Sequence, residues 1–189
     1  GVDIREHGSG NPGGTNSIRW LGKSLGLTII LLDGFKGGLI ILLVRFGVIQ
    51  LEFLDPLLFG VVGAIGHVYP VFLKFKGGKA VAATGGMLVA YNPIWALICI
   101  VVFFIVIKIS KFVSIGSTSI PITMILLSII WSLFHIQVFQ PLTVGNIWLH
   151  EIPYFIFMFV LIVYRHQSNY RNIKNGIEPT VNWAEKKAA

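Results

Sequence analysis

Lys79 lies in a basic, glycine-rich segment, FKGGKAVAATGG (Phe75 to Gly86), between two apolar stretches of the chain. A charge and an irregular backbone are costly at membrane depth unless they border a watery or protein-lined cavity. Consecutive glycine N–H groups beside a helix start bind phosphate, and a lysine there adds a point charge. The segment is not a GxxxxGK[ST] nucleotide-binding loop, because Ala80 follows Lys79. We therefore predict an anion site that includes Lys76, Gly77, Gly78 and Lys79.

The alternative for this segment is a positively charged loop that only sets membrane orientation, and we favour that alternative for Lys74. Asp33 and Lys36 lie three residues apart inside another apolar stretch, which favours an ion pair on one helical face. Ionisable groups within a membrane are functional candidates. A self-paired couple that fixes helix packing is the simpler interpretation of these two residues.

A second polar segment, GSGNPGGTNSIRWLGK (Gly8 to Lys23), combines five glycines with hydroxyl and amide side chains. Glycines let the backbone approach an oxyanion closely, and the hydroxyls and amides supply neutral donors. A guanidinium adds a planar fork suited to phosphate. The composition fits a capped interfacial helix with a snorkelling arginine equally well. The candidate binding residues of this segment are Ser9, Asn11, Thr15, Asn16 and Arg19.

The third polar segment, YRHQSNYRNIKNGIEP (Tyr164 to Pro179), contains His166 and Asn169. These two residues share a face if the preceding helix continues past Tyr164. A histidine transfers protons or, when charged, binds phosphate. The competing interpretation is an interfacial belt of aromatic and basic anchors. Four hydroxyl residues follow Lys111 near the same face, and we expect their side chains to bond mainly to helix carbonyls: Ser114, Ser117, Thr118 and Ser119.

Composition indicates a membrane protein. The chain has 189 residues, 54% hydrophobic and 12% charged, with a mean hydropathy of +0.78. A soluble domain carries about 25% charged residues. The net charge of +7 does not indicate nucleic acid, because the basic residues lie between apolar stretches. The single cysteine, Cys99, excludes an internal disulfide framework. The dispersed histidines lack metal-ligand spacing, so the sequence implies no metal and no cofactor.

Six apolar stretches predict an all-α, polytopic bundle of six membrane-spanning helices. They are Leu25 to Val44, Leu57 to Leu73, Ala80 to Tyr91, Ile94 to Ile107, Val113 to Phe134 and Ile147 to Tyr164. Asn92-Pro93 predicts a tight turn between the third and fourth, which are short. A re-entrant segment over Gly77 to Gly86 is the alternative to the third. We expect one membrane domain over residues 1–179 and a short polar tail over residues 180–189.

The distribution of basic residues predicts how the helices are oriented. Outside the predicted helices, thirteen Lys and Arg residues lie on one side and one lies on the other. The positive-inside rule places the side with thirteen, together with both termini, in the cytoplasm. All three polar segments then face the cytoplasm. We therefore predict that they form one composite site.

In this order, and with DGFKG between the first two, the three segments closely resemble the bacterial acyl-phosphate-dependent glycerol-3-phosphate acyltransferases. The resemblance covers Gly1 to about Glu178. It implies an enzyme of the bacterial cell membrane with its active site facing the cytoplasm. The implied reaction moves an acyl chain from acyl phosphate to the 1-hydroxyl of glycerol 3-phosphate, giving lysophosphatidic acid for phospholipids. The implied partners are the two substrates, membrane lipid and the enzyme that makes acyl phosphate, with no nucleic acid.

The resemblance also implies roles for residues that match its motifs. We expect catalysis to depend on Ser9, Arg19, Lys79, His166 and Asn169. We expect substrate to contact Asn11, Thr15, Asn16, Lys76, Gly77, Gly78, Ser114 and Glu178. Because acyl phosphate carries a good leaving group, the enzyme needs chiefly to position two anions and to stabilise developing charge. A substrate phosphate could accept the hydroxyl proton, and the candidate protein base is His166.

Three features depart from the family pattern. The resemblance implies seven spans, of which the first would precede Gly1, so we expect six within residues 1–189. Ala80 stands where glycine is usual, and Asn172 occupies the position of an expected arginine. Two other functional classes remain open at this point. One is a small-anion transporter or channel, which a basic vestibule within a bundle would also serve. The other is a non-catalytic membrane scaffold.

Overall fold

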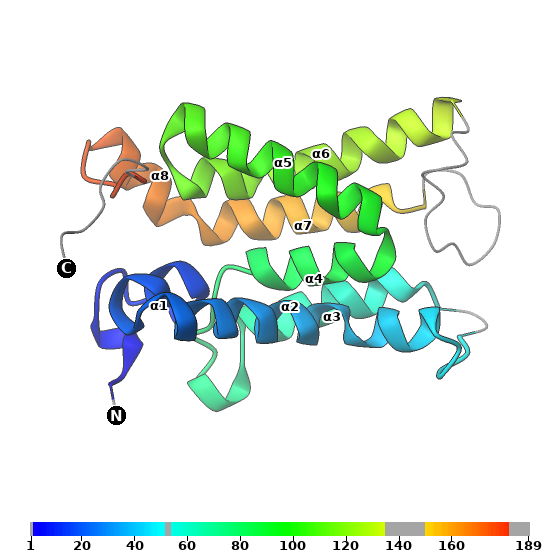
Figure 1. Cartoon of the computed structure of the whole chain (residues 1–189), viewed down its shortest axis with the longest axis horizontal. Coiled ribbons are helices and arrows are strands. Elements are labelled where there is room, and N and C mark those ends of the chain that lie inside the picture. Colours follow the sequence, from blue (N-terminus) through cyan, green and yellow to red (C-terminus); the bar gives the residue numbers. More distant parts are fainter. Residues whose placement is uncertain (1, 52–53, 135–149, 182–189) are drawn as a thin grey trace.

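The computed structural model describes residues 2–51, 54–134 and 150–181. Within these residues the chain is helical: η1 (Ile4–Glu6), α1 (Gly14–Leu21), α2 (Lys23–Arg45), α3 (Pro56–Val68), η2 (Val71–Leu73), α4 (Val81–Tyr91), α5 (Pro93–Ser110), α6 (Val113–Phe134), α7 (Ile152–Arg165) and α8 (Gln167–Lys174). Figure 1 shows two layers, with α1 to α4 in one and α5 to α8 in the other. The first and last described residues lie at the same end of the bundle.

Each of the six predicted apolar stretches contains a helix, which confirms the all-α membrane bundle. Among the residues that the structure describes, four segments are long and apolar enough to cross a membrane: α2, α3 with η2, α5 and α6. The apolar helices α4 and α7 are shorter, at 11 and 14 residues. α4 runs toward the end of the bundle opposite the first described residues and α5 returns (Figure 1). The predicted helix start at Ile147 and tail residues 182–189 lie outside the described residues.

The turn between α4 and α5 is built from Asn92 and Pro93, as the sequence predicts. The Asn92 Oδ1 atom accepts hydrogen bonds from the N–H groups of Ile94 and Trp95, each at 3.1 Å. Pro93 occupies the first helical position, where its missing N–H leaves no acceptor unpaired. The chain therefore reverses direction within two residues.

Buried aromatic side chains join the two layers at the end away from the termini. Tyr91, Trp95 and Phe155 are each 0% exposed, and their rings meet edge to face at 6.3 to 6.5 Å. Beside them the carboxylate of Glu151, also fully buried, accepts hydrogen bonds from Tyr91 Oη and Ser128 Oγ, both at 3.1 Å. A buried carboxylate needs such donors to offset its lost hydration. These contacts close that end of the bundle.

Glycines allow α2 and α4 to pack backbone to backbone. A Cβ atom on Gly86 would collide with the carbonyl oxygen of Gly34, and one on Gly37 would collide with that of Ala83. Small residues allow membrane helices to approach this closely. Gly85 differs from its neighbour, because a Cβ atom there would meet nothing within 4 Å.

This difference predicts opposite effects of the same substitution at adjacent positions. Gly86→Ala should destabilise the folded protein by about 1–3 kcal/mol, because the added methyl group forces α2 away from α4. Gly85→Ala should leave the stability unchanged or raise it by up to about 1 kcal/mol, since alanine favours the helix. Thermal unfolding in detergent micelles measures both. Equal losses for the two variants would contradict the glycine contact.

Candidate active site

A cavity of about 1870 Å³ lies between the layers, and all three polar segments contribute to its wall. Apolar residues from α2, α4 and α5 line another part of it: Leu42, Leu88, Ala96, Cys99, Ile100 and Phe103. Among the predicted site residues that line it are Ser9, Arg19, Lys76, Lys79, Ser114, His166, Asn169 and Glu178. Within the described residues, no group of His, Cys, Asp and Glu side chains is arranged to hold a metal ion.

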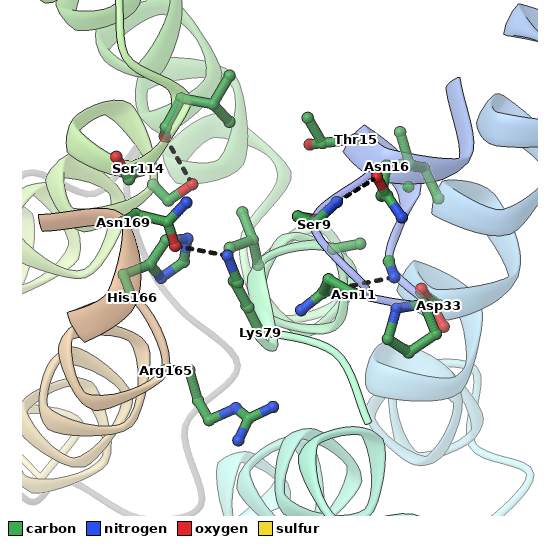
Figure 2. Close-up of a pocket in the computed structure, with 18 of the residues that line it drawn as sticks. Ser9, Asn11, Thr15, Asn16, Asp33, Lys79, Ser114, Arg165, His166 and Asn169 are labelled. Carbon is green, nitrogen blue, oxygen red and sulfur yellow. Dashed lines mark hydrogen bonds between the residues drawn. The ribbon is translucent and has the colours of Figure 1, made fainter. Parts of the chain in front are cut away.

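The cavity brings together segments that are distant in the sequence. Figure 2 shows Lys79 between two groups, with His166 and Asn169 on one side and Ser9 and Asn11 on the other. The first group follows α7, and the second belongs to the loop before α1. The predicted convergence of the three polar segments is therefore present in the fold.

Lys79 is partly buried and its ammonium group is held by a chain of hydrogen bonds. The Nζ atom donates to Asn169 Oδ1 at 2.5 Å, and Asn169 Nδ2 donates to Glu178 Oε1 at 2.7 Å. Burial lowers the pKa of Lys79. The charge of Glu178 opposes that shift, while nearby Arg165 and Arg19 add to it. Both polar groups of the Asn169 amide are engaged, so this residue positions the cation.

The N–H groups of Gly77 and Gly78 were predicted to bind phosphate, but in the structure they already have backbone partners. The N–H of Gly77 already donates to the carbonyl oxygen of Val68 at 3.0 Å, and that of Gly78 donates to the carbonyl of His67 at 3.2 Å. A Cβ atom on Gly78 would collide with the His67 ring. Gly77 lines the cavity, whereas Gly78 does not belong to its lining. These glycines therefore allow close packing against the end of α3.

The start of α4 lies directly after Lys79. Ala80 is the N-cap residue, with a φ of 64°, in the left-handed region that favours glycine. The glycine that the resemblance leads us to expect at this position would adopt this conformation without strain. The N–H groups in the first turn of a helix have no carbonyl acceptor within the helix, and they favour an anion. The first turn of α4 lines the cavity through Val81 and Ala82, so its N–H groups are candidates for the anion contact expected of the two glycines.

The loop before α1 is shaped by Asn16, which is 3% exposed. Its Oδ1 atom accepts from the N–H of Ser9 at 3.1 Å, and its Nδ2 atom donates to the carbonyls of His7 and Ile4 at 2.9 and 3.2 Å. Asn16 therefore positions Ser9, in contrast to the predicted direct contact with substrate. Asn11 Oδ1 similarly accepts from the N–H of Gly13 at 2.8 Å.

Two further predicted residues of this segment lie on α1. Thr15 is in its first turn and Arg19 is in its last turn. Both side chains are exposed, and both residues line the cavity. Arg19 therefore brings a guanidinium group to the wall that faces Lys79, whose pKa it lowers.

His166 is buried at a break between two helices. α7 ends at Arg165 and α8 begins at Gln167, so the condition that one helix continues through His166 and Asn169 is not met. The Nδ1 atom of His166 lies 2.8 Å from the carbonyl oxygen of Ile162. Because a carbonyl only accepts, this contact places the ring proton on Nδ1 and leaves Nε2 as an acceptor.

Burial lowers the pKa of His166 to about 4, and the charges of Lys79 and Arg165 add to the effect. The imidazole is therefore neutral near neutral pH. The lowered pKa disfavours phosphate binding by a charged His166. A neutral Nε2 can instead accept a hydrogen bond from a hydroxyl group.

Ser114 in α6 differs from the neighbouring hydroxyl residues in its hydrogen bonding. Ser117, Thr118 and Ser119 donate to helix carbonyls, as predicted. Ser114 is 2% exposed, and its Oγ atom has no hydrogen-bond partner in the described part of the chain. It lies in the cavity wall. An unpaired buried hydroxyl costs about 1–3 kcal/mol, and a bound acceptor would remove that cost.

Two interactions around the site were not predicted. Arg165 donates through Nε to the carbonyl of Gly78 and through Nη2 to that of Gly77, at 3.2 and 3.0 Å. Asp33 Oδ1 accepts from Lys36 Nζ at 2.6 Å, as predicted, but it also lies 3.2 Å from His67 Nδ1. A spacing of three residues signals the first partner, whereas the histidine is 34 residues away.

Comparisons with known proteins show which family the chain is similar to. A family profile described as Glycerol-3-phosphate acyltransferase matches residues 1–176. A protein of that name from Geobacillus kaustophilus (strain HTA426) is 40% identical over 188 residues, which span 100% of this chain and 87% of that protein. One from Bacillus subtilis (strain 168) is 39% identical over 183 residues, 97% of this chain and 86% of that protein.

Two solved structures are also similar. The glycerol 3-phosphate form of PlsY (YgiH), an integral membrane glycerol 3-phosphate acyltransferase, superposes with a TM-score of 0.79 and 31% identity. It covers 96% of this chain and 84% of that one. The lysphosphatidic acid form of the same protein gives a TM-score of 0.76 and 30% identity, with 96% and 83% of the two chains covered.

Proposed function

The chain belongs to the glycerol-3-phosphate acyltransferase family and is an integral membrane acyltransferase, and on that premise we propose both of its substrates. The acyl donor is acyl phosphate, and the acceptor is the 1-hydroxyl of glycerol 3-phosphate. The product is 1-acyl-glycerol 3-phosphate, or lysophosphatidic acid, which serves phospholipid synthesis. The related PlsY protein has solved structures in a glycerol 3-phosphate form and a lysphosphatidic acid form.

The observation that carries this proposal is that one cavity joins a cationic region to an apolar region. Lys79 and Arg19 supply the positive charge, while Ala96, Cys99 and Phe103 belong to the apolar wall. An acyl phosphate has an anionic head and an apolar tail, so both parts find a matching surface. A small inorganic anion has no apolar part to bury against that wall. The combination therefore favours acyl transfer.

The transfer step balances with the two substrates alone. A bond forms between the glycerol O1 atom and the acyl carbonyl carbon, and the bond from that carbon to the phosphate oxygen breaks. Inorganic phosphate leaves with the bonding electrons. The hydroxyl proton passes to a phosphate oxygen, either directly or by way of Nε2 of His166. The low pKa of His166 makes it a weak base, which favours the direct transfer.

The side chains around the cavity divide this work. Lys79, Arg19 and Ser9 hold phosphate groups, and Asn169 keeps the lysine ammonium in place. The Nε2 atom of His166 accepts a hydrogen bond from the glycerol hydroxyl and orients it. Because these groups are fixed before substrate arrives, they stabilise developing negative charge without first reorganising.

We place this site on the cytoplasmic face of a bacterial cell membrane. The three polar segments lie at the end of the bundle that carries the first and last described residues (Figure 1), and they contain seven of the fifteen Lys and Arg residues. The positive-inside rule assigns that end to the cytoplasm. The donor then comes from a cytoplasmic reaction that phosphorylates a fatty acid or phosphorolyses an activated acyl group.

Purified protein tests the proposed reaction. Incubation with palmitoyl phosphate and glycerol 3-phosphate should give 1-palmitoyl-glycerol 3-phosphate and inorganic phosphate in equal amounts, as measured by mass spectrometry and phosphate release. Palmitoyl thioesters should not replace the donor. Lys79→Ala should lower kcat/KM by about 100-fold or more while the protein still folds. Phosphate uptake into liposomes without any acylated product would instead identify a transporter.

Ser114 provides a prediction that separates activity from stability. Ser114→Ala should lower kcat/KM by about 10- to 100-fold, because a hydrogen bond to a charged phosphate contributes about 1.5–3 kcal/mol. Its thermal stability should stay equal or rise, because the variant removes an unpaired buried hydroxyl. Ser119→Ala is the matched control, since its hydroxyl bonds to the carbonyl of Gly116. Parallel changes in the two variants would rule out a substrate contact at Ser114.

The shifted pKa of Lys79 predicts how activity depends on pH. Substrate binding needs the charged ammonium, so kcat/KM should fall as pH rises through a pKa below the ordinary lysine value. The charge of Glu178 raises that pKa. Glu178→Gln should therefore move the alkaline limb of the profile to lower pH. An alkaline limb that stays in place in Glu178→Gln would show that another group is titrating.

A further inference from the structure

Arg165 connects the two layers directly beside Lys79. It is the last residue of α7, and its guanidinium group reaches across to the segment that precedes α4. Its Nε and Nη2 atoms donate to the carbonyl oxygens of Gly78 and Gly77 at 3.2 and 3.0 Å. These carbonyls belong to the two residues immediately before Lys79. Figure 2 shows Arg165 on the same side of the site as His166.

The same two glycines are held from the opposite side. Their N–H groups donate to the carbonyl oxygens of Val68 and His67, at the end of α3. The ring of His67 is fixed in turn by Asp33 on α2, at 3.2 Å. Both the N–H and the C=O groups of the two glycines are therefore engaged. This pattern leaves the backbone before Lys79 little freedom to shift.

Residues at the end of α7 and in α8 thus hold both the backbone before Lys79 and its ammonium group. Arg165 holds the backbone before it, and Asn169 holds its ammonium group at 2.5 Å. Building on the proposed function, we propose that Arg165 is a positioning residue for acyl transfer. Its planar fork fixes the Gly77–Gly78 carbonyls and thereby sets the place of the Lys79 ammonium against the substrate phosphates.

The fork matters here more than the positive charge. Arginine presents several N–H donors in one rigid plane, whereas lysine offers a flexible point charge that cannot fix two carbonyls in one geometry. The guanidinium also lies 5.9 Å from the centre of the Tyr69 ring, which helps to orient its plane. The charge of Arg165 lowers the pKa of Lys79, so the charge by itself opposes the cationic form.

The test compares substitutions that keep or remove the charge. Arg165→Lys and Arg165→Gln should each lower kcat/KM by about 10- to 100-fold, because small misplacements of a binding group have effects of that size. Arg45→Lys is the matched control. Arg45 donates to the carbonyls of Ala90 and Tyr91 at 3.1 and 3.3 Å. Like the Arg165 contact, this one joins the end of a helix to backbone carbonyls, but Arg45 does not line the cavity. Arg45→Lys should therefore lower the stability of the protein and leave kcat/KM unchanged.

A double-mutant cycle shows whether Arg165 acts through Lys79. Arg165→Lys should reduce kcat/KM much less in a Lys79→Ala background than in the wild type, since the positioned group is already absent. Full activity in Arg165→Lys would overturn the proposal, because charge alone would then suffice. Additive losses in the cycle would also overturn it. So would equal losses in the Arg165 and Arg45 variants.

Binding measurements separate this proposal from the proposed reaction. Titration calorimetry with glycerol 3-phosphate, and with inorganic phosphate as a second probe, is run on the same four proteins of the cycle. If wild-type protein makes no product from acyl phosphate, the proposed reaction fails. Weakened binding of either probe in Arg165→Lys, non-additive with Lys79→Ala, would still support positioning. Unchanged binding of both probes in that case would reject it.

Discussion

Lys79 places a positive charge where two layers of apolar helices meet, and Asn169 and Glu178 help to keep it charged and in place. Burial disfavours an ammonium group, so each contact that holds it must replace part of its lost hydration. Asn169 supplies an oxygen at 2.5 Å, and Glu178 supports that amide and contributes an opposing charge. The result is a cation that is fixed before a ligand arrives, which is what phosphate binding in a partly dry cavity requires.

The two ends of the bundle solve different physical problems. At one end, the rings of Tyr91, Trp95 and Phe155 fill the space between the layers, and the buried carboxylate of Glu151 is paired. At the other end, the layers enclose a cavity of about 1870 Å³. The aromatic packing keeps the layers together at one end. The cavity at the other end can therefore present polar groups and an apolar wall to the same ligand.

Polar residues near the cavity fall into those that hold the protein and those that remain for a ligand. Asn16 and the two glycines before Lys79 use their polar atoms on neighbouring backbone groups. Ser114 has an unpaired buried hydroxyl, and His166 keeps Nε2 as an acceptor. Residues of both kinds occur side by side in the same sequence motifs. A motif match therefore identifies the site without distinguishing the scaffold from the contacts.

The sequence by itself determined the helical membrane fold, the turn at Asn92 and the Asp33–Lys36 pair. These features depend on hydropathy and on side chains a few residues apart, which one sequence records directly. The motifs also indicated the family and the three segments that meet at the cavity. Only the tertiary structure decided that Arg165 binds the carbonyls before Lys79, that His67 joins Asp33, and that His166 is neutral. Those outcomes depend on burial and on partners 34 to 88 residues away, which local spacing does not encode.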